Sequence, residues 1–538
     1  MINLRVYSIA IFFSMLLILL SIRIIFLTSS SNLKVLAANQ FGYTEITSDI
    51  NYKLIDKNGN EIMNYKPIYY FVVDKKNFKQ YNQEENMEEL LTIKYILKSY
   101  NPDYDITKIF EEAGDKKYFE IDKSTYDKLN SITGIPGTYC YEKDILDRSN
   151  DYSIESMLTN PIYEDNGVVK QKSGLEGLIY DLTKGNEYDS IRFTPDEYGY
   201  YKETGSGDLS KNSNIQLTLD ETLQKEIHDY LQGFNSDNKA RGISAIVMDS
   251  ASGKILSMTQ DDYLLENRNI GYGTFGGFFP GSIFKIAVEA AAFDKNVVSR
   301  DEIFTCLGRY EDYVSNHGSL NIAEALEVSC NDTFVQIGHR IGSDLKNYLY
   351  KLHLNEKVLD MNDEVGGEFL FNDPNLDEGD ITLLSFGQNI RITPIEAAAM
   401  ANTIVNNGIY VKPSIIEGVV NSEGTLTKKW KTTSERVFTD TSSKLVKKDM
   451  EKVLDNDTLK GYKIDGYTMG AKTGTSERMD QGIKLYDGWL VGYITVNEKT
   501  YTICVFSEDL AKNENVGGVV CGPVFNKICS MLIAMNNE

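Results

Sequence analysis

Histidine and cysteine are scarce in this chain of 538 residues, which has four of the former and six of the latter. No G-x-S-x-G sequence is present, so a Ser-His-Asp mechanism is disfavoured. Six cysteines without a C-x-x-C pair are too few for a scaffold built on disulfides. Basic residues are outnumbered, and the formal net charge of −23 argues against nucleic acid or anionic lipid as a partner.

The remaining composition is that of a globular protein, with 42% hydrophobic and 25% charged residues. The length corresponds to about three domains. Near the start, residues 6–22 carry no charge, and a second apolar run, IIFL, follows Arg23. This stretch is long enough to cross a hydrocarbon layer of roughly 30 Å as a helix. It is also longer than the apolar part of a signal peptide, so we expect residues 1–30 to form an uncleaved membrane anchor.

The segment GGFFPGSIFKIAVEAAAF carries the first candidate for chemistry. Pro280 and Gly281 predict a turn, and the apolar spacing after them predicts a helix. Ser282 and Lys285 are three positions apart, so on a helix the hydroxyl and the amine lie on one face. A lysine whose pKa is lowered by burial or by a second cation can activate a serine nucleophile. Taken alone this spacing is weak evidence, because S-x-x-K patterns arise often by chance.

Two later segments strengthen that interpretation. ALEVSCNDTF contains Ser329 and Asn331, and MGAKTGTSE contains Lys472, Thr473, Gly474 and Thr475. The order Ser-x-x-Lys, Ser-x-Asn, Lys-Thr-Gly resembles that of the superfamily of penicillin-binding proteins and serine β-lactamases. In that superfamily the three motifs line one cleft, and each motif alone would be a weak signal.

The resemblance implies a role for each residue of the first two motifs. Ser282 would attack a carbonyl to form an acyl-enzyme, with Lys285 as its general base. Ser329 would relay a proton between Lys285 and the leaving amine. Asn331 would hold a substrate amide.

The third motif would bind the substrate. Lys472 would be a second cation that helps keep Lys285 neutral and attracts a carboxylate, which Thr475 would also bind. Gly474, after Thr473, would let the strand approach the substrate closely. The resemblance also places the oxyanion hole at the backbone N–H groups of Ser282 and Thr475, worth on the order of 3 kcal/mol per donor.

Residues 31–212 carry no visible catalytic cluster. The sequence predicts a hairpin at Asn58-Gly59 and helices in 86–100 and 173–185. KNGNEI, IPGTYC, SGLEGLIYDLTKGN and IQLTLDETLQKEIHDYL resemble successive landmarks of class B penicillin-binding proteins. There this region is a non-catalytic pedestal or dimerisation domain. The Arg-Gly usual before its first strand is missing here.

Residues 213–538 are expected to form the transpeptidase domain. A helix in 219–234, strands in 243–260 and 487–509, and a closing helix in 522–535 are predicted. Strands from both ends with helices between them favour an α+β fold, with a central antiparallel sheet flanked by helices.

The resemblance therefore implies a D,D-transpeptidase that cross-links peptidoglycan stem peptides and is a target of β-lactams. It would be a single-pass protein of the cell membrane with its catalytic domain outside the cell. No cofactor or metal is required by this chemistry. A polytopic membrane glycan polymerase would be a partner, because nothing in the sequence resembles a glycosyltransferase domain.

Three alternatives remain open. A D,D-carboxypeptidase would resolve the same acyl-enzyme with water. A β-lactamase or β-lactam sensor would usually lack the pedestal. A catalytically idle scaffold would recruit wall machinery through residues 31–212, although the complete motif set argues against it.

Cys306, His317 and Cys330 lie close together in the sequence and pose a separate question. They have the ligand types of a zinc site, but their spacing matches no standard motif. Buried cysteine often acts as a small hydrophobic residue, and His317-Gly318 is also typical of a structural turn. The sequence favours the structural interpretation and leaves zinc open.

Overall fold

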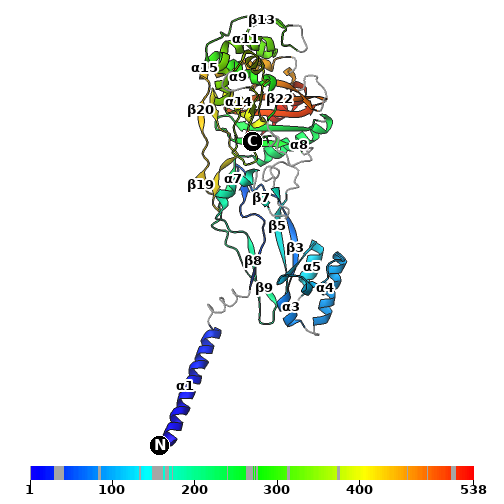
Figure 1. The fold of residues 1–538 in the computed structure, drawn as a ribbon, viewed down its shortest axis with the longest axis vertical. Coiled ribbons are helices and arrows are strands. Elements are labelled where there is room, and N and C mark those ends of the chain that lie inside the picture. The colour runs from blue at the N-terminus through cyan, green and yellow to red at the C-terminus, as the bar shows by residue number, and fades with distance from the viewer. Residues whose placement is uncertain are drawn as a thin grey trace. The chain divides into compact units, whose positions relative to one another are not determined.

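The computed structural model describes residues 2–29, 42–82, 86–132, 135–147, 162–163, 169–171, 174–238, 240–261, 271, 273, 277–311, 316–371, 376–456, 459–480, 483–510 and 517–537. The chain forms two compact units (Figure 1). The first comprises residues 1–51, 64–146 and 185–212, and the second comprises 52–63, 147–184 and 213–538. Two segments inside the expected pedestal range 31–212 thus belong to the second unit.

The first unit is built on two small sheets with strand orders β4-β3-β5 and β1-β8-β9. Its elements are α1 (Ile2–Ser29), β1 (Tyr43–Ile46), β3 (Tyr65–Asp74), α3 (Lys75–Tyr81), α4 (Met87–Tyr100), η2 (Ile109–Glu111), β4 (Lys116–Ile121), α5 (Lys123–Ser131), β5 (Thr138–Leu146), β8 (Ser190–Pro195) and β9 (Tyr201–Ser206). The helix predicted at 86–100 is confirmed as α4.

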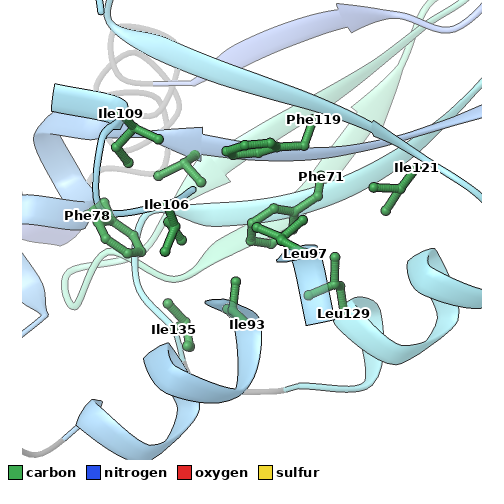
Figure 2. Packing of buried hydrophobic residues seen from close by; sticks show 11 residues of the cluster. Phe71, Phe78, Ile93, Leu97, Ile106, Ile109, Phe119, Ile121, Leu129 and Ile135 are labelled. Atoms are coloured by element: carbon green, nitrogen blue, oxygen red, sulfur yellow. The ribbon is translucent and has the colours of Figure 1, made fainter. Parts of the chain in front are cut away.

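A hydrophobic core joins the sheet of β3, β4 and β5 to helices α4 and α5 (Figure 2). Phe71 of β3 and Phe119 of β4 face Ile93 and Leu97 of α4 and Leu129 of α5, and all five side chains are buried. Burying side chains of this size contributes about 1.5–3 kcal/mol each. The first unit therefore has a core of its own.

The second unit holds most of the chain. Its elements up to the Ser329 turn are β2 (Leu54–Ile55), β6 (Ile162–Tyr163), β7 (Val169–Gln171), α7 (Gly174–Thr183), β10 (Asn214–Leu217), α8 (Glu221–Asn238), β11 (Gly242–Asp249), β12 (Ile255–Gln260), η3 (Gly281–Phe284), α9 (Lys285–Asp294), β13 (Phe304–Cys306), β14 (Gly318–Leu320) and α10 (Ile322–Glu327). Those after it are α11 (Asn331–Ile341), η4 (Gly342–Asp344), α12 (Leu345–Lys351), β15 (Glu368–Phe369), α13 (Glu378–Leu384), β16 (Ile390–Arg391), α14 (Pro394–Val405), β17 (Ile409–Val411), β18 (Ile416–Val420), β19 (Leu426–Lys429), β20 (Ser434–Arg436), α15 (Asp440–Val453), η5 (Lys460–Tyr462), β21 (Thr468–Asp480), β22 (Ile483–Val496), β23 (Lys499–Leu510), η6 (Gly517–Cys521) and α16 (Gly522–Asn537).

A five-stranded sheet of order β12-β11-β23-β22-β21 is the centre of this unit, and every neighbouring pair is antiparallel. Helices α8 and α16 contact each other and the sheet, and α14 and α15 do the same. In Figure 1, α9, α11, α14 and α15 gather beside the strands of this unit. The α+β fold with a central antiparallel sheet and flanking helices is confirmed.

Local sequence explains why β22 and β23 meet as a hairpin. Asn497 and Glu498 both have positive φ, at 47° and 68°, which is the backbone that a two-residue type I′ turn requires. Val496 and Lys499 pair directly on either side of the turn. The turn thus sets the register of the strands that support the third motif.

Helix α1 has an exposed apolar surface along its described side chains. Within the described residues, one helix is long and apolar enough to cross a membrane, Gly517–Asn537, and 56% of its apolar window is buried inside the protein. That burial is typical of a core helix of the second unit. The described apolar part of α1 is Ile9–Ile24, which is shorter, so the N-terminal anchor stays a prediction.

Candidate active site

The first motif lies where a short 3-10 turn leads into a helix. Pro280 precedes η3, and α9 begins at Lys285. Residues three apart eclipse one another in a 3-10 turn, which brings Ser282 and Lys285 together. The Lys285 Nζ donates to Ser282 Oγ at 3.1 Å. Lys285 is fully buried, while Ser282 is partly accessible, as a nucleophile must be.

The second motif lies in the sharp turn between α10 and α11. Ser329 has a φ of +59°, and this left-handed backbone turns its carbonyl and hydroxyl oxygens toward Lys285. The Lys285 Nζ donates to Ser329 O at 2.5 Å, to Ser329 Oγ at 3.2 Å and to Asn331 Oδ1 at 2.6 Å. The amide nitrogen of Asn331 donates to Tyr310 O at 2.8 Å. Asn331 thus braces Lys285 against the backbone of the 310–311 segment.

The third motif lies on β21, the edge strand of the central sheet. Lys472 is 1% exposed, and its Nζ donates to Ser329 Oγ at 3.0 Å and to Thr473 O at 2.9 Å. The Ser329 hydroxyl is therefore shared by two buried lysines. Burial and the nearby Lys285 charge lower the pKa of Lys472 well below its usual value, because two adjacent ammonium groups in a dry site repel each other.

Two glycines allow the backbones of the first and third motifs to pack closely. A Cβ on Gly474 would come within 2.8 Å of Pro280 O, so this glycine makes room for the nucleophile's own turn. Gly281 has a φ of +54°, and a Cβ there would come within 2.8 Å of Thr475 O. The β21 backbone and the Ser282 turn are therefore in direct contact.

All five residues expected to carry chemistry come together around the Lys285 amine and the Ser329 hydroxyl: Ser282, Lys285, Ser329, Asn331 and Lys472. Thr473 and Thr475 are partly exposed on the edge strand, and Thr475 Oγ1 accepts from Gly517 N at 3.4 Å. The roles of these residues, and the oxyanion hole, stay predictions.

The sequence predicted Trp489 as a strand-core residue near the cleft, and it did not identify two other supports of the site, Tyr310 and Glu311. Trp489 is fully buried and its Nε1 donates to Phe279 O at 3.0 Å, which fixes the strand-to-turn segment before Ser282. Tyr310 acts through its backbone carbonyl, and no side-chain pattern signals a carbonyl. Glu311 accepts from Asp332 N at 3.0 Å next to the second motif. No motif or spacing in the sequence pointed to this residue.

A family model matches residues 243–530, and its description is "Penicillin binding protein transpeptidase domain". The matched stretch covers more than half of the chain and contains all three motifs.

Curated relatives extend beyond that domain. Stage V sporulation protein D of Bacillus subtilis is 24% identical over 88% of this chain and 77% of the relative. Peptidoglycan D,D-transpeptidase FtsI of Escherichia coli is 26% identical over 68% of this chain and 64% of the relative. The chain thus spans less than two thirds of the FtsI length.

A crystal structure of penicillin-binding protein 3 from Mycobacterium tuberculosis, complexed with aztreonam, has the same fold. It superposes with a TM-score of 0.62 at 18% identity and covers 92% of this chain and 97% of that one.

Proposed function

The chain belongs to the penicillin-binding protein transpeptidase family, and on that premise we propose that it cross-links peptidoglycan stem peptides through an acyl-enzyme on Ser282. The observation that carries this proposal is the placement of Ser282 Oγ 3.1 Å from the Lys285 amine, with both lysines within hydrogen-bond distance of the Ser329 hydroxyl. The relative named as a D,D-transpeptidase supports the reaction class.

Acylation begins at the penultimate D-Ala carbonyl of a stem peptide ending in D-Ala-D-Ala. Ser282 Oγ forms the new bond while the neutral Lys285 amine takes its proton. Backbone N–H groups of Ser282 and Thr475 stabilise the tetrahedral oxyanion. When this intermediate collapses, the C–N bond to the terminal D-Ala breaks and leaves an ester on Ser282.

Ser329 completes the proton path. Its Oγ lies 3.2 Å from the Lys285 Nζ and 3.0 Å from the Lys472 Nζ. It can pass the proton taken by Lys285 to the departing amine of D-Ala. An amine of a second stem peptide then attacks the ester and loses its proton by the reverse route, which regenerates Ser282.

Substrate binding sets which lysine is charged. Charge on either buried lysine disfavours charge on the other. A substrate carboxylate beside Lys472 and Thr475 favours the proton on Lys472, and Lys285 is left neutral as the base. Binding of the substrate carboxylate thus leaves Lys285 able to take the proton of Ser282.

The membrane and a glycan polymerase are the partners expected for such an enzyme. Helix α1 anchors the chain in the cell membrane, and the second unit acts outside the cell. The first unit contacts a polytopic glycan polymerase, which supplies the strands to be cross-linked. β-Lactams acylate Ser282 because they imitate the D-Ala-D-Ala amide.

An exchange assay tests the reaction. The full chain in detergent is given a peptide ending in D-Ala-D-Ala together with isotope-labelled D-Ala, and the products are separated by mass spectrometry. We expect labelled peptide from the parent and from the control Ser422→Ala, an exposed serine, and none from Ser282→Ala. Hydrolysed peptide without label would indicate a carboxypeptidase, and labelled peptide from Ser282→Ala would refute the assignment of the nucleophile.

A further inference from the structure

Four side chains that the mechanism does not use converge beside the second motif. Cys306, Glu311, His317 and Cys330 each direct one ligand atom into a cluster whose atoms all lie within 4.8 Å of one another. The two cysteines are buried, Glu311 has 6% of its side chain exposed and His317 has 17%. Both thiols are free of disulfide bonds.

The spacing of these atoms matches a metal-centred tetrahedron. Glu311 Oε1 lies 3.3 Å from Cys330 Sγ and 3.8 Å from Cys306 Sγ. His317 Nδ1 lies 3.7 Å from Cys306 Sγ and 3.7 Å from Glu311 Oε1. Zinc bonds of about 2.0–2.3 Å give ligand-to-ligand edges of about 3.3–3.8 Å in a regular tetrahedron. The four distances fall within that interval.

We propose that Cys306, Glu311, His317 and Cys330 form a structural zinc site. Two sulfurs, one imidazole nitrogen and one carboxylate oxygen suit zinc, whereas magnesium and calcium require oxygen ligands. Four protein ligands fill the tetrahedron and leave no position for water, so the ion acts structurally. On binding, the two thiols form sulfur–zinc bonds and release their protons to solvent. This assignment replaces the buried-cysteine and turn interpretations that the sequence favoured.

The site connects the β13–β14 hairpin to the turn between α10 and α11. Cys306 ends β13, and His317 immediately precedes β14, the strand paired with it. Cys330 lies at the start of α11, between Ser329 and Asn331. Zinc thus fastens the β13–β14 hairpin to the turn that carries the second motif.

Its effect on catalysis rests on the proposed function. Ser329 has a left-handed backbone and shares its hydroxyl with both lysines. Glu311 accepts from Asp332 N, and the adjacent Tyr310 O accepts from Asn331. Removing the ion frees Glu311 and Cys330 together, so the turn loses its fixed position. A displacement of about 1 Å in a catalytic group costs on the order of 100-fold in rate.

Metal content is the first measurement. The full chain, expressed with added zinc and purified in detergent, is analysed by inductively coupled plasma mass spectrometry. We expect about one zinc per chain in the parent, in Ser282→Ala and in the controls Cys140→Ala and His339→Ala, and little in Cys330→Ala and His317→Ala. Folded parent that neither contains nor takes up zinc would overturn the site, as would full zinc content in both ligand variants.

Chelation of the unmodified chain covers the case in which a ligand variant fails to fold. Treatment with a zinc chelator should lower the thermal midpoint and slow acylation by a fluorescent penicillin on the order of 100-fold, and added zinc should restore both. Unchanged stability and rate after verified zinc loss would contradict the role proposed for the ion. A Cys306–Cys330 disulfide in the purified chain would overturn the site. A parent chain that contains zinc but is not acylated at Ser282 would instead count against the proposed function.

Discussion

Ser329 combines a strained backbone with a central place in the proton path. Its φ of +59° is a conformation that side-chain-bearing residues rarely adopt, and it costs about 1–2 kcal/mol. The turn keeps this conformation because Ser329 N donates to Leu326 O and Cys330 N to Ala325 O, at 3.2 and 2.9 Å. The left-handed backbone of Ser329 thus destabilises the fold slightly but places its hydroxyl between Lys285 and Lys472.

Two substitutions separate the strain from the chemistry. Ser329→Gly and Ser329→Ala both remove the hydroxyl, so we expect both to lower the acylation rate at least 100-fold. The glycine variant relieves the left-handed strain and should be about 1 kcal/mol more stable than the alanine variant. Fluorescent-penicillin kinetics and chemical unfolding measure the two effects. Wild-type acylation in either variant would remove Ser329 from the proton path.

At this scale the sequence predicts local pairs better than distant ones. Ser282 and Lys285 are three positions apart, so a helical turn was enough to bring them together. The contact of Ser329 with Lys472 joins residues far apart in the sequence and was expected from family resemblance alone. The position of Glu311 depends on how one loop closes, and no propensity or spacing rule predicts that closure.

Among the elements, β21 and η3 depend on each other. Gly474 is next to the carbonyl of Pro280, and a methyl group there would displace the turn or the strand. We expect Gly474→Ala to slow acylation by about tenfold or more, because the nucleophile moves relative to Lys472. The control Gly461→Ala has open space at its Cβ position and should acylate at the parent rate. Equal acylation rates in the two variants would show that the close approach of Gly474 to Pro280 does not affect acylation.

Helices α9 and α15 bury a pair of carboxyl groups between them. Glu289 and Asp449 are fully buried, and Arg300 is paired with Asp449. Burial, and after it the Asp449 charge, raise the pKa of Glu289 well above 4.5. As pH rises, the unfolded chain loses this proton first, so the folded state loses stability through that range.

Replacing Glu289 removes this dependence. Glu289→Gln does not titrate, so we expect its thermal midpoint to fall less than that of the parent between about pH 5 and about pH 8. Glu423→Gln, at an exposed position, should follow the parent. Scanning calorimetry at several pH values makes the comparison. Parallel curves for parent and Glu289→Gln would mean that Glu289 is ionised in the folded protein.

The positions of helices and strands were the features best predicted from the sequence. The strands of 243–260 and 487–509 and the helices α4, α7, α8 and α16 formed where periodicity and capping residues predicted them. Thr393 and Glu396 form a capping box with Pro394 at the start of α14. Periodicity and capping depend on residues within one segment, so contacts with distant parts of the chain did not change these helices and strands.

The whole molecule was less predictable, because its units are not continuous in sequence. Residues 52–63 and 147–184 fold with the second unit although first-unit segments lie on both sides of them. Leu54 and Ile55, for example, pair in parallel with β10. A boundary drawn from composition follows the chain and cannot show such crossings.

Helix α1 carries the prediction of membrane attachment. Its apolar side chains are exposed along the described part of the helix, which favours a lipid environment. Deleting residues 2–29 should move the protein from the membrane fraction to the soluble fraction and leave the β-lactam acylation rate within about twofold. Fractionation followed by fluorescent-penicillin labelling tests both outcomes. Continued membrane association of the deletion variant would place the attachment elsewhere.

The most direct test of Ser282 as the acylated nucleophile is the intact mass of the full chain after incubation with benzylpenicillin, measured beside Ser282→Ala. We expect a single stable adduct on the parent, located by peptide mapping at Ser282, and no adduct on the variant. An adduct that persists in Ser282→Ala, or a folded parent that forms none with several β-lactams, would contradict this assignment.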